Sequence, residues 1–204
     1  MTLAALEAAV APHGLFVMGV DGRRALLGTD AVWWSVFCHT AEARDGAPDP
    51  VDRWSKRVIG KVAEVFGAQE SYPSDGPPYA PFIAWALATG RFWQSPTGMM
   101  VHDTAGLMIS IRGALEFAAP FEVHRPRASP CDTCADRPCI NACPVGALGA
   151  AQPYDVPICK AYLKQDEGQD CMDRGCAVRR ACPVSQTFDR NIAQSAFHMK
   201  AFLG

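Results

Sequence analysis

Residues 131–144 read CDTCADRPCINACP and residues 171–183 read CMDRGCAVRRACP, with Cys159 between these two runs. The segments hold eight of the nine cysteines of the chain, and each run ends in Cys-Pro. A four-iron cluster needs four thiolates that converge from different directions, and a short loop supplies three of them before the chain turns away. The pattern therefore predicts a pair of iron–sulfur clusters.

Zinc and disulfide bonds are the two alternative uses of so many cysteines. A four-cysteine zinc site uses paired, closely spaced cysteines, and a disulfide framework belongs to small secreted chains. Neither a zinc site nor a disulfide framework requires proline directly after the last cysteine of a run. Proline fixes φ and removes an amide donor, so the chain leaves a cluster ligand in a defined direction. The endings at Pro144 and Pro183 favour iron–sulfur clusters over both alternatives.

The two runs resemble the pattern of bacterial two-cluster ferredoxins, in which three cysteines of a run hold one cluster and the fourth holds the other. Each Cys-Pro would then complete the cluster of the other run. The resemblance implies a first ligand set of Cys131, Cys134, Cys139 and Cys182, and a second set of Cys143, Cys159, Cys171 and Cys176.

The length of 204 residues and an apolar content of 49% are sufficient for two small domains with real cores. We expect an α/β scaffold over residues 1–120 and a ferredoxin-like two-cluster domain over residues 121–204, so the fold class is α+β. The first residues lack a basic segment followed by an apolar one, and no apolar run approaches the ~18 residues of a membrane span. These features predict a cytoplasmic protein with no membrane segment, in a compartment that keeps thiols reduced.

The formal net charge is −2 with neutral cysteines, and each oxidised cluster would add about −2 more. Several arginines close to the runs are expected to offset this charge: Arg125, Arg127, Arg137, Arg174, Arg179 and Arg180. A docking patch for an acidic partner is the alternative role. Because the chain has no overall basic excess, nucleic acid is an improbable partner.

The first 120 residues show mixed helical and strand periodicity. We expect helices at 3–10, 50–66 and 81–89, strands at 15–20, 31–38 and 106–117, and a Pro- and Gly-rich loop at 72–79. In the second helix, Asp49 is the expected N-cap and Gly67 the stop. Its expected buried face contains Val51, Trp54, Val58, Val62 and Val65. A linker at 118–130 and a final helix capped by Asp189 and ending at Leu203 complete the prediction.

The scaffold and the runs together resemble the epoxyqueuosine reductase and reductive dehalogenase group. The similarity is carried by the stretch 14–20 (GLFVMGV), by 105–107 (AGL) through 113–115 (GAL), by 158–163 (ICKAYL) and by the two Cys-Pro endings. The resemblance implies a cobalamin held between a nitroreductase-like α/β scaffold and the cluster module, with electrons passing from the clusters to cobalt and on to substrate.

Four residues around the AGL element are candidates for contact with a cofactor. His102 and Asp103 precede the element, Gly106 is its centre, and Arg112 is the basic residue before Gly113. Polar residues at such a turn could face a cofactor or donate a proton. A capping or turn role is the alternative for the same side chains.

Two classes of function follow from these patterns. In the first, the chain is an electron-transfer protein that receives electrons from a redox partner protein and delivers them through two [4Fe–4S] clusters to a partner or to a site on its scaffold. In the second, it is a cobalamin-dependent reductase whose clusters supply a bound corrinoid that acts on a small-molecule substrate. A purely structural role for the clusters is a third interpretation.

Overall fold

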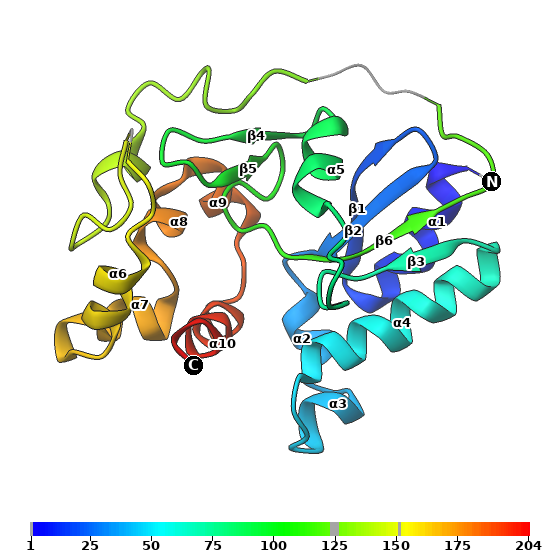
Figure 1. Ribbon diagram of the computed structural model, residues 1–204, viewed down its shortest axis with the longest axis horizontal. Coiled ribbons are helices and arrows are strands. Elements are labelled where there is room, and N and C mark those ends of the chain that lie inside the picture. The colour runs from blue at the N-terminus through cyan, green and yellow to red at the C-terminus, as the bar shows by residue number, and fades with distance from the viewer. Residues whose placement is uncertain (1, 123–126, 151) are drawn as a thin grey trace. The chain divides into compact units, whose positions relative to one another are not determined.

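The computed structural model describes residues 2–122, 127–150 and 152–204, and it shows a mixed α+β protein (Figure 1). The chain divides into two compact units, of which the first comprises Met1–Arg91 with Ser110–Arg127 and the second Phe92–Ile109 with Ala128–Gly204. The segment 92–109, which we expected in the scaffold, thus belongs to the cysteine-rich unit. Its side chains Val101 and Leu107 share a hydrophobic cluster with Cys139 and Cys182, which explains this assignment.

The first unit is built on an antiparallel sheet of four strands. In sheet order these are β1 (Leu15–Asp21), β2 (Arg24–Thr29), β6 (Ile111–Glu116) and β3 (Gln69–Ser71). The strands β1 and β2 form a tight hairpin in which Asp21 pairs with Arg24, and Gly22 supplies the positive φ that the turn needs. The nitroreductase-like and ferredoxin-like descriptions of the two units remain predictions.

The described residues of the first unit also form six helices. They are α1 (Leu3–Val10), η1 (Ala11–His13), α2 (Trp33–Phe37), α3 (Ala41–Arg44), α4 (Pro50–Phe66) and α5 (Phe82–Ala88). Of these, α1, α4 and α5 pack against strands of the sheet. The long helix α4 packs against β6 and β3 (Figure 1). The predicted helices at 3–10, 50–66 and 81–89 and the predicted strand at 15–20 are confirmed.

The predicted strand at 31–38 is wrong, because this segment forms the short helix α2. Its Val, Trp and Phe residues favour strands locally, yet tertiary packing decides the outcome. The buried Trp33 ring stacks on Phe37 at 4.7 Å between centroids and meets Trp54 of α4 edge-on at 5.5 Å. The strand that pairs with β1 is instead β2, which lies in a segment where we predicted no strand.

Two details of α4 also differ from prediction. Asp49 has a φ of 51° and makes no side-chain cap, while Gly67 ends the helix in the left-handed conformation as expected. Val51, Trp54, Val58 and Val62 are buried, but Val65 is 77% exposed. Val65 lies in the last turn of the helix, directly before its final residue Phe66.

The second unit contains a small hairpin and the helices that carry the cysteines. The hairpin pairs β4 (Phe92–Gln94) with β5 (Met100–His102), and the helices are η2 (Pro138–Asn141), α6 (Val156–Leu163), η3 (Asp166–Gly168), α7 (Gln169–Arg174), α8 (Ala177–Ala181), α9 (Pro183–Phe188) and α10 (Ile192–Leu203). None of the helices in the described ranges combines the length and apolar character that a membrane span requires.

Two predicted boundaries in this part of the chain are wrong. The strand expected over 106–117 begins only at Ile111, because Gly106 lies in a tight turn with a φ of 57°. The final helix is capped by Asn191, whose side chain accepts a hydrogen bond from the Ala193 amide at 2.8 Å. Asp189 instead ends the preceding helix α9 in the left-handed conformation. Part of the predicted linker, residues 123–126, lies outside the described residues.

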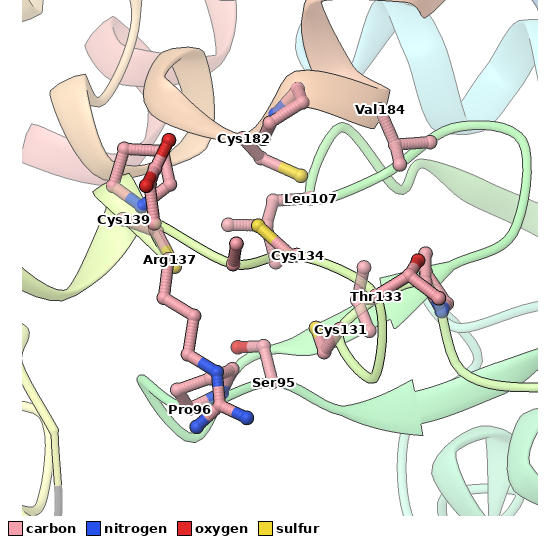
Figure 2. A pocket seen from close by; sticks show the side chains of 16 residues that line it. Ser95, Pro96, Leu107, Cys131, Thr133, Cys134, Arg137, Cys139, Cys182 and Val184 are labelled. Carbon is pink, nitrogen blue, oxygen red and sulfur yellow. The ribbon is translucent and has the colours of Figure 1, made fainter.

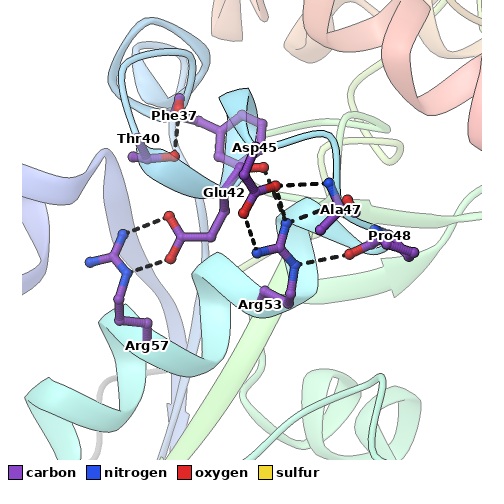
Figure 3. Close-up of polar contacts among 8 residues, drawn as sticks. All are labelled: Phe37, Thr40, Glu42, Asp45, Ala47, Pro48, Arg53 and Arg57. Atoms are coloured by element: carbon purple, nitrogen blue, oxygen red, sulfur yellow. Dashed lines mark hydrogen bonds and ion pairs between the residues drawn. The ribbon is translucent and has the colours of Figure 1, made fainter.

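Two arginines of α4 fasten the short helix α3 and the loop that follows it (Figure 3). Arg57 forms a two-point ion pair with Glu42, with Nη2 at 2.9 Å from Oε2. Arg53 donates to Asp45 at 2.8 Å and to the Pro48 carbonyl at 2.9 Å. The hydrogen bonds from Arg57 hold the pKa of Glu42 at about 2, well below its ordinary value. Two-point arginine–carboxylate pairs are stronger than single contacts.

We predict that Glu42→Gln lowers the free energy of unfolding by about 1 kcal/mol at pH 7. Because the pKa of Glu42 is lower in the folded state, its contribution is present above pH 4.5 and is lost as the pH falls towards about 2. The difference between the variant and the parent protein should therefore disappear over this range, measured by denaturant titration with tryptophan fluorescence. Glu64→Gln is the control, since Glu64 meets Lys61 at 3.7 Å with both side chains at least 75% exposed. Equal pH dependence of both variants would contradict the assignment.

Candidate metal centres

The first candidate centre is a cavity of about 380 Å³ in the second unit. Its cysteines come from three places in the sequence, since two lie in the loop after Pro130, one in η2 and one directly before α9. They are Cys131, Cys134, Cys139 and Cys182, and Figure 2 shows their side chains around the same space. The structure thus brings together the four residues of the first predicted ligand set.

The walls of this cavity are largely apolar. Cys139 and Cys182 belong to a buried cluster with Val101, Leu107, Leu148 and Val178. In contrast, Thr133, Ala135, Asp136 and Arg137 at the cavity are exposed. The cavity is therefore closed by core residues on one side and open along the loop 132–138 on the other.

The second candidate centre is a smaller cavity of about 20 Å³ lined by the other four cysteines of the runs. Cys143 follows η2, Cys159 lies on α6, Cys171 on α7, and Cys176 at the start of α8. Tyr154 and Tyr162 line the same cavity, together with Met199 of α10. The second predicted ligand set is thus also brought together, in tighter surroundings than the first.

All eight of these thiols are free, and the electrostatic coupling among them follows the same grouping. Burial raises the pKa of Cys131 and Cys139, and the neighbouring charge of Cys182 and Cys134 raises both further. In the second set, burial and the charges of Cys176 and Cys143 raise the pKa of Cys159. A cationic metal among such thiols would offset this mutual repulsion and stabilise the thiolate forms.

The arrangement differs from that of a single-ion site. Among the described residues, no group of three or more His, Cys, Asp or Glu side chains is close enough to hold one metal ion. Instead, each set of four cysteines lines a cavity. Soft thiolates are the ligands that iron–sulfur clusters use. The donor sets therefore fit a four-iron cluster in their chemistry.

The turn after β5 is fastened to the helices around Cys182 by hydrogen bonds. The Leu107 amide donates to Ser185 Oγ at 2.8 Å, the Arg179 guanidinium donates to the Leu107 carbonyl, and that of Arg190 donates to the Met108 carbonyl. Ser185 is buried and lies three residues after Cys182. These contacts hold Leu107 against the first cavity. Sequence reasoning missed Ser185, and only its nearness to Cys182 could have indicated it.

The four residues proposed to contact a cofactor have structural partners. His102 is fully buried, and its Nδ1 accepts hydrogen bonds from the amides of Thr104 and Ala105 at 3.1 and 3.0 Å. Asp103 lies 3.3 Å from the other ring nitrogen of His102. The backbone of Gly106 pairs with that of His102. These three residues form the turn after β5.

Arg112 belongs to the first unit, unlike the other three candidates. Its guanidinium lies 3.5 Å from Asp52 of α4, and its Nε donates to the Ile111 carbonyl. Burial lowers the pKa of Arg112. Arg112 therefore forms an ion pair that links β6 to α4.

The arginines expected to offset cluster charge have diverse partners. Arg137 lines the first cavity, and Arg179 binds the Leu107 carbonyl. Arg174 and Arg180 both pair with Asp170. Arg127 is exposed in the first unit, and Arg125 lies outside the described residues. Arg137 and Arg179 are thus the members of this group with direct contacts at the first cavity or its wall.

No model of a known protein family matches this chain, and no curated protein is significantly similar to it.

Proposed function

We propose that this chain is an electron-transfer protein that binds two [4Fe–4S] clusters, one in each cysteine-lined cavity. The observation that supports the proposal most strongly is the grouping of eight free thiols into two sets of four, each of which contains cysteines of both runs. When bound, such clusters supply reversible one-electron transfer over a wide range of potentials.

The residues of the chain would hold the clusters and control access to them. Cys131, Cys134, Cys139 and Cys182 would be the ligands in the first cavity, and Leu107 and Val101 would exclude water from its inner wall. In the second cavity the ligands would be Cys143, Cys159, Cys171 and Cys176. Burial among apolar side chains and hydrogen bonds to sulfur both shift the potential of such centres.

A redox partner would exchange electrons most readily at the first cavity. The loop 132–138 at its open side is exposed, whereas the second cavity is nearly filled by its own side chains. We therefore propose that a partner protein docks at this loop, close to Arg137, and that the second centre relays electrons within the unit.

The test is a redox titration of the full chain after anaerobic reconstitution with iron and sulfide. We expect two centres that are reduced and reoxidised reversibly, and that pass electrons to an artificial acceptor such as a viologen or cytochrome c. Centres that form but show no reversible reduction would overturn the electron-transfer proposal and favour a structural role.

The same sample also tests the cobalamin-dependent alternative. The reconstituted protein is incubated with cobalamin and desalted, and its absorption and cobalt EPR signal are recorded. Loss of all corrinoid supports the simple electron carrier, and stoichiometric retention would support the reductase.

A further inference from the structure

Ser95 brings a buried hydroxyl to the wall of the first cavity. It lines this cavity together with the four cysteines of the first set, and Figure 2 shows its side chain there. The residue is 5% exposed. The other lining residues with hydroxyl or charged side chains, Thr133, Asp136 and Arg137, are exposed. Ser95 is therefore the buried hydroxyl in an otherwise largely apolar inner wall.

The position of Ser95 is fixed by the turn between β4 and β5, whose sequence at 95–98 is SPTG. The Ser95 amide donates to the Met99 carbonyl at 2.8 Å, and the Ser95 carbonyl accepts from the Gly98 amide at 2.9 Å. The ring of Pro96 fixes φ at the second position of this turn, where proline is favoured. Both backbone polar groups of Ser95 are thus used within the hairpin, and its hydroxyl is the polar group that it presents to the cavity.

A second buried hydroxyl lies next to that of Ser95. Thr97 Oγ1 is 3.1 Å from Ser95 Oγ, and Thr97 is 2% exposed and lies outside the cavity lining. Two hydroxyls carry two protons, and the hydrogen bond between them uses one. The described part of the chain provides neither hydroxyl with another hydrogen-bond partner. The second proton therefore needs an acceptor, because buried polar groups are almost always paired.

The surroundings of the two hydroxyls determine which of them carries the second proton. If Ser95 donated to Thr97, the proton of Thr97 would be left among buried residues without an acceptor, which is costly. If Thr97 donates to Ser95, the proton of Ser95 is free to point into the cavity. Sulfur atoms of a cluster would be the acceptors there.

We propose that Ser95 donates a hydrogen bond to a sulfur of the first centre and raises its reduction potential, with Thr97 as the positioning residue that directs this hydroxyl. The inference rests on the proposed function, since it requires a cluster in the first cavity. Reduction adds negative charge that is shared by the sulfurs. A donated hydrogen bond therefore stabilises the reduced state more than the oxidised state.

The experiment compares reconstituted full-length parent protein, Ser95→Ala and Thr97→Val in EPR-monitored redox titrations. The first centre is identified as the one lost in Cys182→Ala. Ser95→Ala should lower its potential such that the ratio of oxidised to reduced centre at a given potential rises about tenfold, or about 59 mV for one electron. Thr97→Val keeps a branched side chain and the proton of Ser95, so its first centre should shift by clearly less. Equal shifts in both variants, or a shift in Thr97→Val alone, would contradict the inference.

Pulsed EPR in heavy water gives a readout that a purely structural serine would not change. The reduced first centre of the parent protein should show coupling to an exchangeable deuterium that Ser95→Ala lacks and Thr97→Val retains. A purely structural Ser95 would affect the yield of the first cluster while this coupling and the potential stayed as in the parent protein, which overturns the inference.

The possible failures are distinguishable from one another. If the parent protein assembles no clusters, the proposed function fails and this inference fails with it. If both clusters assemble and Ser95→Ala has the potentials of the parent protein, the inference alone is wrong.

Ser95→Thr decides the case in which Ser95→Ala does not assemble its first cluster. This variant keeps the hydroxyl, so its first centre should retain the potential and the deuterium coupling of the parent protein. Loss of the coupling while the hydroxyl is present would contradict the inference.

Discussion

Replacing Cys182 by alanine is expected to remove the cluster of the first cavity and to leave that of the second intact. Cys182 lies in the second cysteine run, yet it lines the cavity of Cys131, Cys134 and Cys139. The iron content should fall from about eight to about four atoms per chain, with loss of one [4Fe–4S] EPR signal. Cys143→Ala should have the reciprocal effect, because Cys143 lines the cavity of the second run.

Double variants test which cysteines share a cluster, and they do so without assigning each EPR signal to one of the two cavities. Cys131→Ala added to Cys182→Ala should cause no further loss of [4Fe–4S] signal, because both residues line one cavity. Cys159→Ala added to Cys182→Ala should remove the remaining signal. Cys38→Ala is the control, since Cys38 lies in the first unit, and it should keep both clusters. If Cys131→Ala and Cys159→Ala exchanged these effects, the grouping would be wrong.

Gly106→Ala is expected to be the most damaging substitution outside the cysteines. Gly106 has a φ of 57°, and an added Cβ would lie 2.4 Å from the Ser185 backbone nitrogen and 2.6 Å from its Oγ. Ser185 follows Cys182 in α9, so the clash displaces the turn that holds Leu107 against the first cavity. We expect a loss of about 2–4 kcal/mol in the free energy of unfolding of the second unit. The first cluster should assemble in reduced yield, measured by iron content and EPR.

Gly98→Ala is the control that separates the steric clash with Ser185 from the free-energy cost of placing a side chain at positive φ. Gly98 lies in the same hairpin segment with a φ of 78°, but a Cβ there would meet nothing within 4 Å. Its replacement should cost only about 1–2 kcal/mol and should leave cluster yield unchanged. Equal losses in the two variants would show that contact with Ser185 is unimportant.

The cysteine grouping was predictable because the ferredoxin-like pattern links distant residues by a simple rule. Each Cys-Pro was assigned to the other run, and the structure places Cys182 and Cys143 in these cavities. Amphipathic and capped helices such as α4 were equally accessible, since periodicity and Gly67 are local signals. Whether the cysteines bind iron stays a prediction.

Other features depend on contacts that no local pattern contains. The segment 31–38 has the composition of a strand but becomes a helix because Trp33 packs between Phe37 and Trp54. The hairpin 92–109 joins the cysteine-rich unit through Leu107 and Ser185, which are 78 residues apart. The Tyr154 ring stacks on that of Phe202, which lies near the end of the chain. Such pairs become visible only once the chain is folded.

The most direct test of two four-iron clusters is the metal and sulfide content of the anaerobically reconstituted full chain, combined with Mössbauer spectra of the ⁵⁷Fe-loaded protein. The account predicts about eight iron and about eight sulfide per chain, all in [4Fe–4S] centres. Zinc bound without sulfide, or cysteines oxidised to disulfides in a protein that takes up no iron, would contradict it.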